Sequence, residues 1–200
     1  MADHAAAIAG LPRWHPDPLV RGTIDTIRRA GWAVTAVGDA CTCGRADCVP
    51  PLCAFAYTSG LGLHDIPELV VYGLDSRTAT VVLNTLGHLL HRHDGKALVD
   101  REVAIDLTGT FDAPIRLIEV VDKSDLLISN ELFPDLPALQ VVWADELGTF
   151  PWEAGYTLRP MQQPVKGVPR ADGGFVRGQR TVLGANRAQR RAARRRTPRE

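Results

Sequence analysis

The chain has 200 residues, of which 45% are hydrophobic and 23% are charged, and these values are typical of a soluble globular protein with one domain. No apolar run approaches the roughly 20 residues that cross a bilayer, which argues against a membrane-spanning protein. The N-terminus carries the acidic Asp3 where a signal peptide would carry positive charge, so we expect a cytoplasmic protein.

The formal net charge of zero conceals two segments of opposite charge. From residue 177 to the end, the chain has nine arginines and one acidic residue. Subtracting these from the totals of 23 basic and 23 acidic residues leaves 14 basic and 22 acidic residues in the preceding part. The sequence therefore predicts an acidic folded body followed by a basic tail.

The first half of the body has clear helix and strand patterns. Residues 1–16 are rich in alanine and proline and are predicted to be a flexible N-terminus. Asp17 is a suitable N-cap for a helix that begins at Pro18 and stops at Gly31. Short β-branched or aromatic runs predict strands at 32–37, 53–59 and 68–74.

The clearest helix is predicted to begin at Asp75 or Ser76 and to end at Gly95. Its apolar stripe recurs at three- and four-residue steps and consists of Ala79, Val82, Leu83, Leu86 and Leu90. Further strands are predicted at 101–108, 113–121 and 138–145, with a helical piece over 124–132. This order is not a regular strand–helix alternation. It predicts an α+β fold with a mixed or largely antiparallel sheet and helices packed on one face.

We expect a single α+β domain over residues 17–160, which contains a cysteine-rich loop at 39–53. Residues 161–200 are predicted to be a linker followed by the arginine-rich tail. The tail has no hydrophobic stripe, so it is predicted to be disordered unless it is bound to a partner.

All four cysteines lie in the loop, with the spacing C-x-C-x4-C-x4-C: Cys41, Cys43, Cys48 and Cys53. Cytoplasmic thiols stay reduced, so clustered cysteines indicate metal or redox chemistry before structural disulfides. Four thiolates can surround a zinc ion tetrahedrally, and closed sites of this kind are structural. We expect a structural zinc knuckle. The alternatives are free or core thiols, and a disulfide or redox pair.

The C-terminal tail contains six closely spaced arginines: Arg187, Arg190, Arg191, Arg194, Arg195 and Arg196. Arginines at this density attract phosphates, and such binding falls steeply with salt. No aromatic residues are interleaved, so base stacking and sequence readout are not indicated. The expected partner is nucleic acid or an acidic protein, and the alternative is a solubilising tail.

Two groups of polar residues are candidate sites. Tyr57, His64 and Glu68 flank a glycine-containing turn, where a phenol, an imidazole and a carboxylate can transfer protons, although turn geometry alone explains the glycines. On the long helix, His88 and His91 share one face with Asn84. They can bind metal or act as acid and base, or they form only a polar flank near the helix end. No phosphate loop or nucleophile elbow is present.

Several strings resemble a bacterial family catalogued as domain of unknown function 4262: GWAVTAV, AFAYTSGL, PELVVYGL and ALQVVWADELGTFPWEAGY. The resemblance covers residues 31–156. The family often has Gly-His-Pro-Glu-Leu where this chain has Asp65-Ile66-Pro67-Glu68-Leu69. The resemblance implies a shared fold without implying an activity. In its final segment, the aromatic rings of Trp143, Phe150 and Trp152, with Asp145, either line a ligand pocket or close a core.

Our leading hypothesis is a non-enzymatic accessory protein with a zinc knuckle and a basic tail that contacts an anionic partner. One alternative is a small enzyme or ligand-binding domain with its site near Tyr57, His64 and Glu68. Another is an immunity-type or regulatory interaction module that uses its acidic face.

Overall fold

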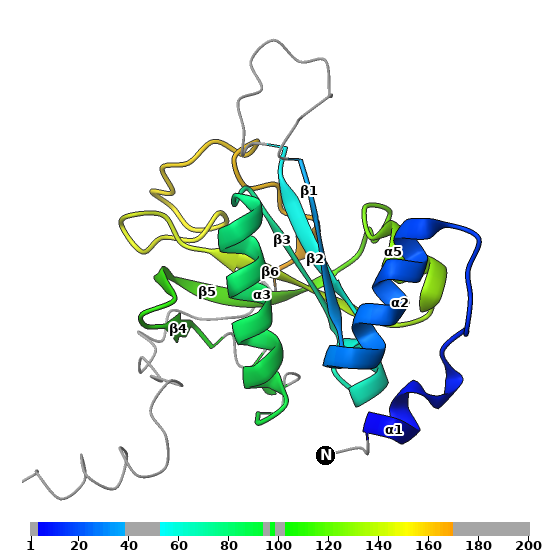
Figure 1. Ribbon diagram of the computed structural model, residues 1–200. Coiled ribbons are helices and arrows are strands. Elements are labelled where there is room, and N and C mark those ends of the chain that lie inside the picture. The colour runs from blue at the N-terminus through cyan, green and yellow to red at the C-terminus, as the bar shows by residue number, and fades with distance from the viewer. Residues whose placement is uncertain (1–3, 39–52, 94–96, 99–102, 170–200) are drawn as a thin grey trace, which may run out of the picture.

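The computed structural model describes residues 4–38, 53–93, 97–98 and 103–169 (Figure 1). Within these residues, the centre of the fold is a seven-stranded sheet with the order β1-β2-β3-β6-β5-β4, and β7 pairs with β5 outside this path. β3 and β6 run parallel, whereas the other neighbouring strands run antiparallel. The predicted α+β fold with a mixed sheet is confirmed. The strands are β1 (Ala33–Val37), β2 (Phe55–Ser59), β3 (Glu68–Tyr72), β4 (Ile105–Leu107), β5 (Phe111–Val120), β6 (Ala138–Trp143) and β7 (Gly167–Val168).

The two longest helices have the N-caps that the sequence predicts. In α2, Asp17 Oδ1 accepts hydrogen bonds from the backbone N–H groups of Leu19 and Val20 at 2.7 and 3.4 Å. In α3, Asp75 Oδ1 accepts from Arg77 and Thr78 at 3.1 and 3.0 Å. α3 ends at Leu90, before the predicted end at Gly95, which lies outside the described residues. The helices are α1 (His4–Ala7), α2 (Pro18–Ala30), α3 (Ser76–Leu90) and α5 (Leu127–Leu132), with 3-10 turns η1 (Ile8–Gly10) and η2 (Leu61–His64).

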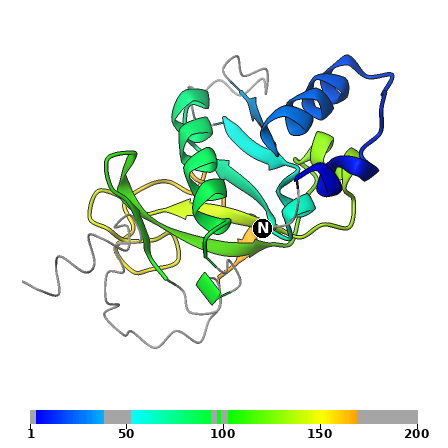
Figure 2. The ribbon, with the colours of Figure 1, turned by 60° about the horizontal axis from the view of Figure 1, so that its bottom comes forward.

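Side chains of β3 alternate between two apolar clusters on opposite faces of the sheet. Leu69 and Val71 face the apolar stripe of α3, and Figure 2 shows α3 lying along the sheet. On the other face, Val70 and Tyr72 pack with residues at the start of α5, among them Leu126. α2 also packs beside β1, through Ile27 and Ala33. Helix α3 therefore covers one face as predicted, and shorter helical segments also contact the other.

The N-terminal residues, predicted to be flexible, pack against α2. Leu11 is 5% exposed and lies in an apolar cluster with Ile27 and Ala33. Arg28 Nη2 donates to the carbonyl oxygens of Leu11 and Pro12, at 3.0 Å in each case. Burial of Leu11 and the two hydrogen bonds from the Arg28 guanidinium together hold this segment against α2.

The C-terminal segment also contacts the sheet beyond residue 160, where the sequence predicted the linker to begin. The side chain of Gln163 is buried, accepts from Trp143 N and donates to Trp143 O, both at 2.8 Å. Four residues on, β7 pairs with Glu119 and Val120 of β5. These bonds satisfy backbone groups at the end of β6, which a sequence pattern of turn residues does not indicate. Among the described residues, no helix is both long and apolar enough to cross a membrane.

Candidate functional site

Four of the six histidines form a chain of ring contacts with one buried tryptophan, Trp32. The His88 ring meets the Trp32 ring edge-on at 4.8 Å between centroids, and the His91 ring is tilted against it at 5.4 Å. His64 lies edge-on to His91 at 5.0 Å, and His4 stacks on His64 at 5.8 Å. We call these five residues the histidine–tryptophan cluster. It joins α1, η2 and the C-terminal end of α3.

Close backbone approach positions Trp32 against α3. Gly31 ends α2 with a φ of 94°, in the left-handed region that glycine favours, and Trp32 follows it directly. The Trp32 ring then packs on Gly87, where an added Cβ would lie 3.1 Å from a ring carbon. Its indole N–H donates to Asn84 Oδ1 at 3.0 Å. The helix face that the sequence predicted, with Asn84, His88 and His91, is therefore the face that receives Trp32.

The imidazoles of His64 and His91 are the least satisfied groups of the cluster. The Nε2 atoms of both rings are buried and have no hydrogen-bond partner among the described residues. Burial lowers the pKa of His91, and the charges of His64, of His88 and of the amino terminus lower it further. His91 is therefore neutral at neutral pH, and its buried nitrogen carries the cost of an unsatisfied polar atom.

Among the described residues, the cluster has neither the arrangement of a metal site nor a carboxylate partner. Among the residues that the structure describes, no group of three or more histidine, cysteine or acidic side chains is arranged to hold a metal ion. The described structure also gives none of the four imidazoles a carboxylate partner by hydrogen bond or ion pair. A proton added to this cluster would therefore meet only like charge.

The predicted trio of Tyr57, His64 and Glu68 is distributed over different surroundings. Glu68 is 1% exposed and its carboxylate accepts from Thr58 Oγ1 at 2.6 Å, and from the backbone of Gly60 and Gly62 at 2.8 and 3.1 Å. Burial raises the pKa of Glu68, and these hydrogen bonds oppose the rise without cancelling it. The carboxylate thus holds the backbone turn that leads from β2 into η2.

Tyr57 has a structural partner of its own on the apolar face that includes Tyr72. Its hydroxyl oxygen accepts a hydrogen bond from the backbone N–H of Ile128, at 3.2 Å, near the start of α5. Its ring stacks with Phe55 at 6.2 Å, and Phe55 also stacks with Tyr72 at 5.7 Å. Of the trio, only His64 belongs to the histidine–tryptophan cluster. His4 and Trp32 are the members that sequence reasoning missed, because nothing in their local pattern indicates a shared partner.

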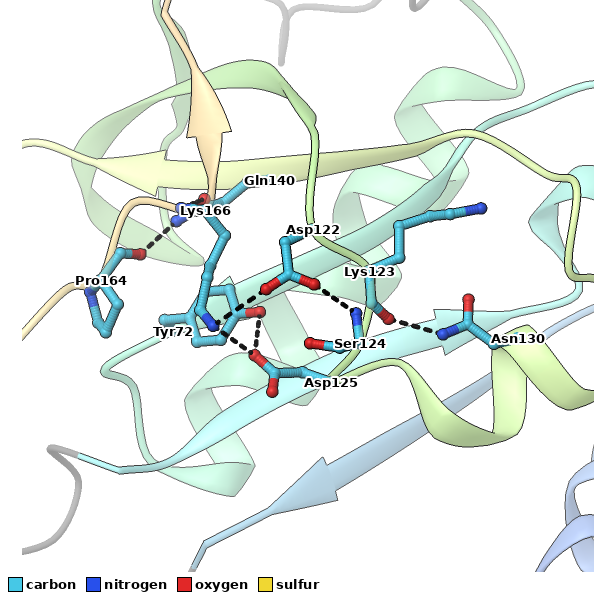
Figure 3. A network of polar contacts seen from close by, with 9 residues as sticks. All are labelled: Tyr72, Asp122, Lys123, Ser124, Asp125, Asn130, Gln140, Pro164 and Lys166. Carbon is cyan, nitrogen blue, oxygen red and sulfur yellow. Dashed lines mark hydrogen bonds and ion pairs between the residues drawn. The ribbon is translucent and has the colours of Figure 1, made fainter.

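A second polar network, absent from the sequence analysis, lies beside Tyr72 (Figure 3). The Tyr72 hydroxyl donates to Asp125 Oδ2 at 2.9 Å, and Lys166 Nζ lies 3.3 Å from the same oxygen and 3.7 Å from Asp122 Oδ2. Burial, and then Asp125, raise the pKa of Tyr72, so its phenol stays protonated. The backbone N–H of Lys166 donates to Gln140 Oε1 at 2.7 Å. This network fastens the C-terminal segment to the sheet.

The aromatic segment at the end of the domain closes a small core. Phe150 is buried, stacks with Trp152 at 5.5 Å, and lies under the Arg116 guanidinium at 4.3 Å. Asp145 is 4% exposed and accepts from the backbone of Leu147, Thr149 and Thr157 and from the Thr157 hydroxyl. Burial alone would raise the pKa of Asp145, but these donors outweigh it and hold the pKa below the ordinary value. Of the two interpretations, core closure is the one these contacts support.

The other predicted site residues lie largely outside the described residues. These are Cys41, Cys43 and Cys48, and the six arginines from Arg187 to Arg196. Cys53 is described, is half-buried and precedes β2 by two residues. The zinc knuckle and the anion-binding tail therefore stay predictions.

Comparison with known proteins identifies the family. The model of a domain of unknown function, DUF4262, matches residues 26–157, in agreement with the resemblance seen in the sequence. The curated proteins and the solved structures were also searched, and neither search found a match. The matched residues include β1 to β6 and the whole histidine–tryptophan cluster except His4. Because the match covers more than half of the chain, the protein belongs to the DUF4262 family.

Proposed function

We propose that this protein is a binding protein that contacts an anionic partner, such as nucleic acid, through its arginine-rich C-terminal segment. The observation that carries the proposal is the separation of charge along the chain. Nine arginines and one acidic residue follow residue 176, whereas the preceding part has 14 basic and 22 acidic residues. An acidic body repels a polyanion, so attraction has to come from the C-terminal arginines.

The contacts in the body agree with a binding role. The carboxylates of Glu68 and Asp145, which are buried, each accept at least three hydrogen bonds from neighbouring turns. The Tyr57 hydroxyl accepts from the backbone near the start of α5. These groups hold the fold, so the body serves as a scaffold. β7, which pairs with β5, fixes the point from which the C-terminal segment begins.

Salt dependence provides a quantitative test. If all six closely spaced arginines contact phosphates, the logarithm of the binding constant should fall with the logarithm of salt concentration with a slope of about −5. Deleting 185–200 should abolish binding to a labelled duplex or single strand and leave the circular dichroism spectrum of the body unchanged. As a matched control, replacing the six arginines by lysine should retain most of the affinity, whereas replacing them by glutamine should remove it. Unchanged binding after the deletion would overturn the proposal.

We further propose that Cys41, Cys43, Cys48 and Cys53 hold a structural zinc ion. The support is the hairpin that flanks them, because Val37 of β1 is paired with Phe55 of β2. At Gly38, an added Cβ would lie 2.7 Å from the Cα of Ala54, so the two ends of the cysteine-rich loop meet. Four thiols within one closed loop can converge on a metal, with zinc–sulfur distances of about 2.3 Å.

A further inference from the structure

The N-terminal residues 4–12, here called the N-terminal strap, cover an apolar groove. Ile8 and Leu11 of the strap pack into it. The side chains that line the groove come from α2, β1, η2 and the end of α5, and they are Ile27, Ala33, Leu63, Leu132 and Phe133. Without the strap, the apolar area that it covers on these side chains would be exposed to water, which is unfavourable.

One hydrogen bond and one ring contact of the strap involve histidine. His4 Nε2 donates to the carbonyl oxygen of Arg28 at 3.1 Å, and Arg28 Nη2 returns bonds to Leu11 O and Pro12 O. The His4 ring stacks on the His64 ring, with an angle of 11° between their planes. His64 in turn contacts His91. The strap is therefore attached to the body beside a chain of three neighbouring imidazoles.

A positive charge on one of these imidazoles would meet other imidazoles and no described carboxylate. The groups whose charges act on His91 are His64 from η2, His88 from α3 and the amino terminus, and His4 from α1 stacks on His64. In the described part of the chain, no carboxylate is bonded to any of them. The buried Nε2 atoms of His64 and His91 also have no acceptor that could take a new N–H.

We propose that the N-terminal strap is a pH-sensitive cover, which leaves its groove when His91 takes up a proton. Protonation places a cation next to the His64 ring, where no described residue provides a counter-ion or a hydrogen-bond acceptor. Release of the strap brings both imidazoles into water, where a charge is solvated. Opening exposes the apolar groove between α2, η2 and α5.

The sign of the pH effect follows from linkage. Burial and like charge hold the pKa of His91 below its ordinary value of 6.5 in the closed form, and opening returns it toward that value. The open form therefore binds more protons in the interval between the two values, so the opening constant rises as the pH falls below about 6.5. It levels off below the pKa of the closed form. Each unit of difference in pKa changes the opening constant by up to about tenfold.

Hydrogen exchange on the full chain tests the proposal. The reporter is the amide of Leu11, which donates to Ile8 O at 3.1 Å within the strap. After correction for intrinsic exchange, its protection should fall as the pH is lowered from about 7.5 to about 5. The double variant His64→Gln with His91→Gln should lose this pH dependence. The matched control is His93→Gln, which removes a neighbouring imidazole outside the cluster and should behave as wild type.

Two results would overturn the proposal: protection of Leu11 that is unchanged down to about pH 5, or the same pH dependence in the double variant. If the double variant does not fold, as judged by circular dichroism, His4→Gln provides the test, because it removes an imidazole from the strap itself and should weaken the pH dependence. Ring proton titration of the wild type gives an independent reading. His91 should titrate below its ordinary pKa of 6.5, and an ordinary titration of its ring would contradict the mechanism.

Discussion

Glu68 is expected to stabilise the fold through its hydrogen bonds, and two substitutions separate this role from its charge. Its carboxylate accepts from two backbone N–H groups, of Gly60 and Gly62, and from the Thr58 hydroxyl. Glu68→Ala removes all three acceptor contacts from a site that is 1% exposed. Glu68→Gln keeps a carbonyl oxygen for the two amides and offers an N–H₂ group to Thr58.

The expected loss of unfolding free energy comes from the backbone N–H groups that lose their acceptor. Each buried amide that loses its partner costs about 1–3 kcal/mol, whereas the hydroxyl can rotate toward another acceptor. Removing the carboxylate also removes its own unfavourable desolvation, which offsets part of this cost. We therefore expect Glu68→Ala to lower the free energy of unfolding by about 3 kcal/mol, and Glu68→Gln to lower it by about 1 kcal/mol.

Urea unfolding followed by circular dichroism measures both values, with the exposed Glu146→Ala as the matched control. Because burial raises the pKa of Glu68 above its ordinary value of 4.5, the folded state binds a proton before the unfolded state does as the pH falls. Wild type should therefore gain stability relative to Glu68→Gln as the pH is lowered toward 4.5. The reasoning is refuted if Glu68→Ala costs no more than the Glu146→Ala control, or if Glu68→Gln costs as much as Glu68→Ala.

Three further predictions concern other parts of the chain. Asp145→Asn should lower the free energy of unfolding at neutral pH. Because the pKa of Asp145 is lowered in the folded state, wild type loses this stabilisation in acid, and the difference between the two proteins should shrink there. Urea unfolding midpoints at two pH values measure the difference. Purified protein should contain about one zinc per chain by elemental mass spectrometry. Cys43→Ser should lose the metal and melt at a lower temperature. A metal-free wild type would contradict the proposed zinc site. Asp65 has a φ of 60°, so Asp65→Gly should leave stability unchanged or raise it. Asp135→Gly, at an ordinary φ, should lower the free energy of unfolding by about 0.5–1 kcal/mol. Equal losses of stability in thermal melts would contradict this reasoning.

Local patterns were sufficient to predict most helices and strands. α2 has an aspartate cap, a proline at its first position and a glycine stop, all within 15 residues, so its bounds follow from neighbouring residues alone. The apolar stripe of α3 faces the sheet as its spacing predicts. The segments before α2 and after residue 160, in contrast, contact partners that are distant in the sequence. Leu11 is fixed by Arg28 of α2, and Gln163 is fixed by Trp143 of β6.

The candidate site shows the same division between local and distant contacts. The shared face of Asn84, His88 and His91 is a local property of the helix period, and it was predicted. That Trp32 and His64 reach this face depends on how η2 and the end of α2 meet α3. These contacts span sequence separations that no periodicity encodes. Proximity in the sequence grouped His64 with Tyr57 and Glu68. In the structure, the three side chains have different partners.

The departure from the family motif acquires a physical meaning in the structure. Where the family often has Gly-His, this chain has Asp65-Ile66, and Asp65 is the one non-glycine residue with a positive φ among those described. A left-handed conformation suits glycine, and aspartate is among the few residues that tolerate it. Ile66 is 7% exposed and packs in the large core cluster, so a histidine at position 66 would sit in the α3-facing core. His64, on the other side of Asp65, instead reaches His91 and the N-terminal strap. His64 and position 66 therefore lie in different surroundings, one in the histidine–tryptophan cluster and the other in the core.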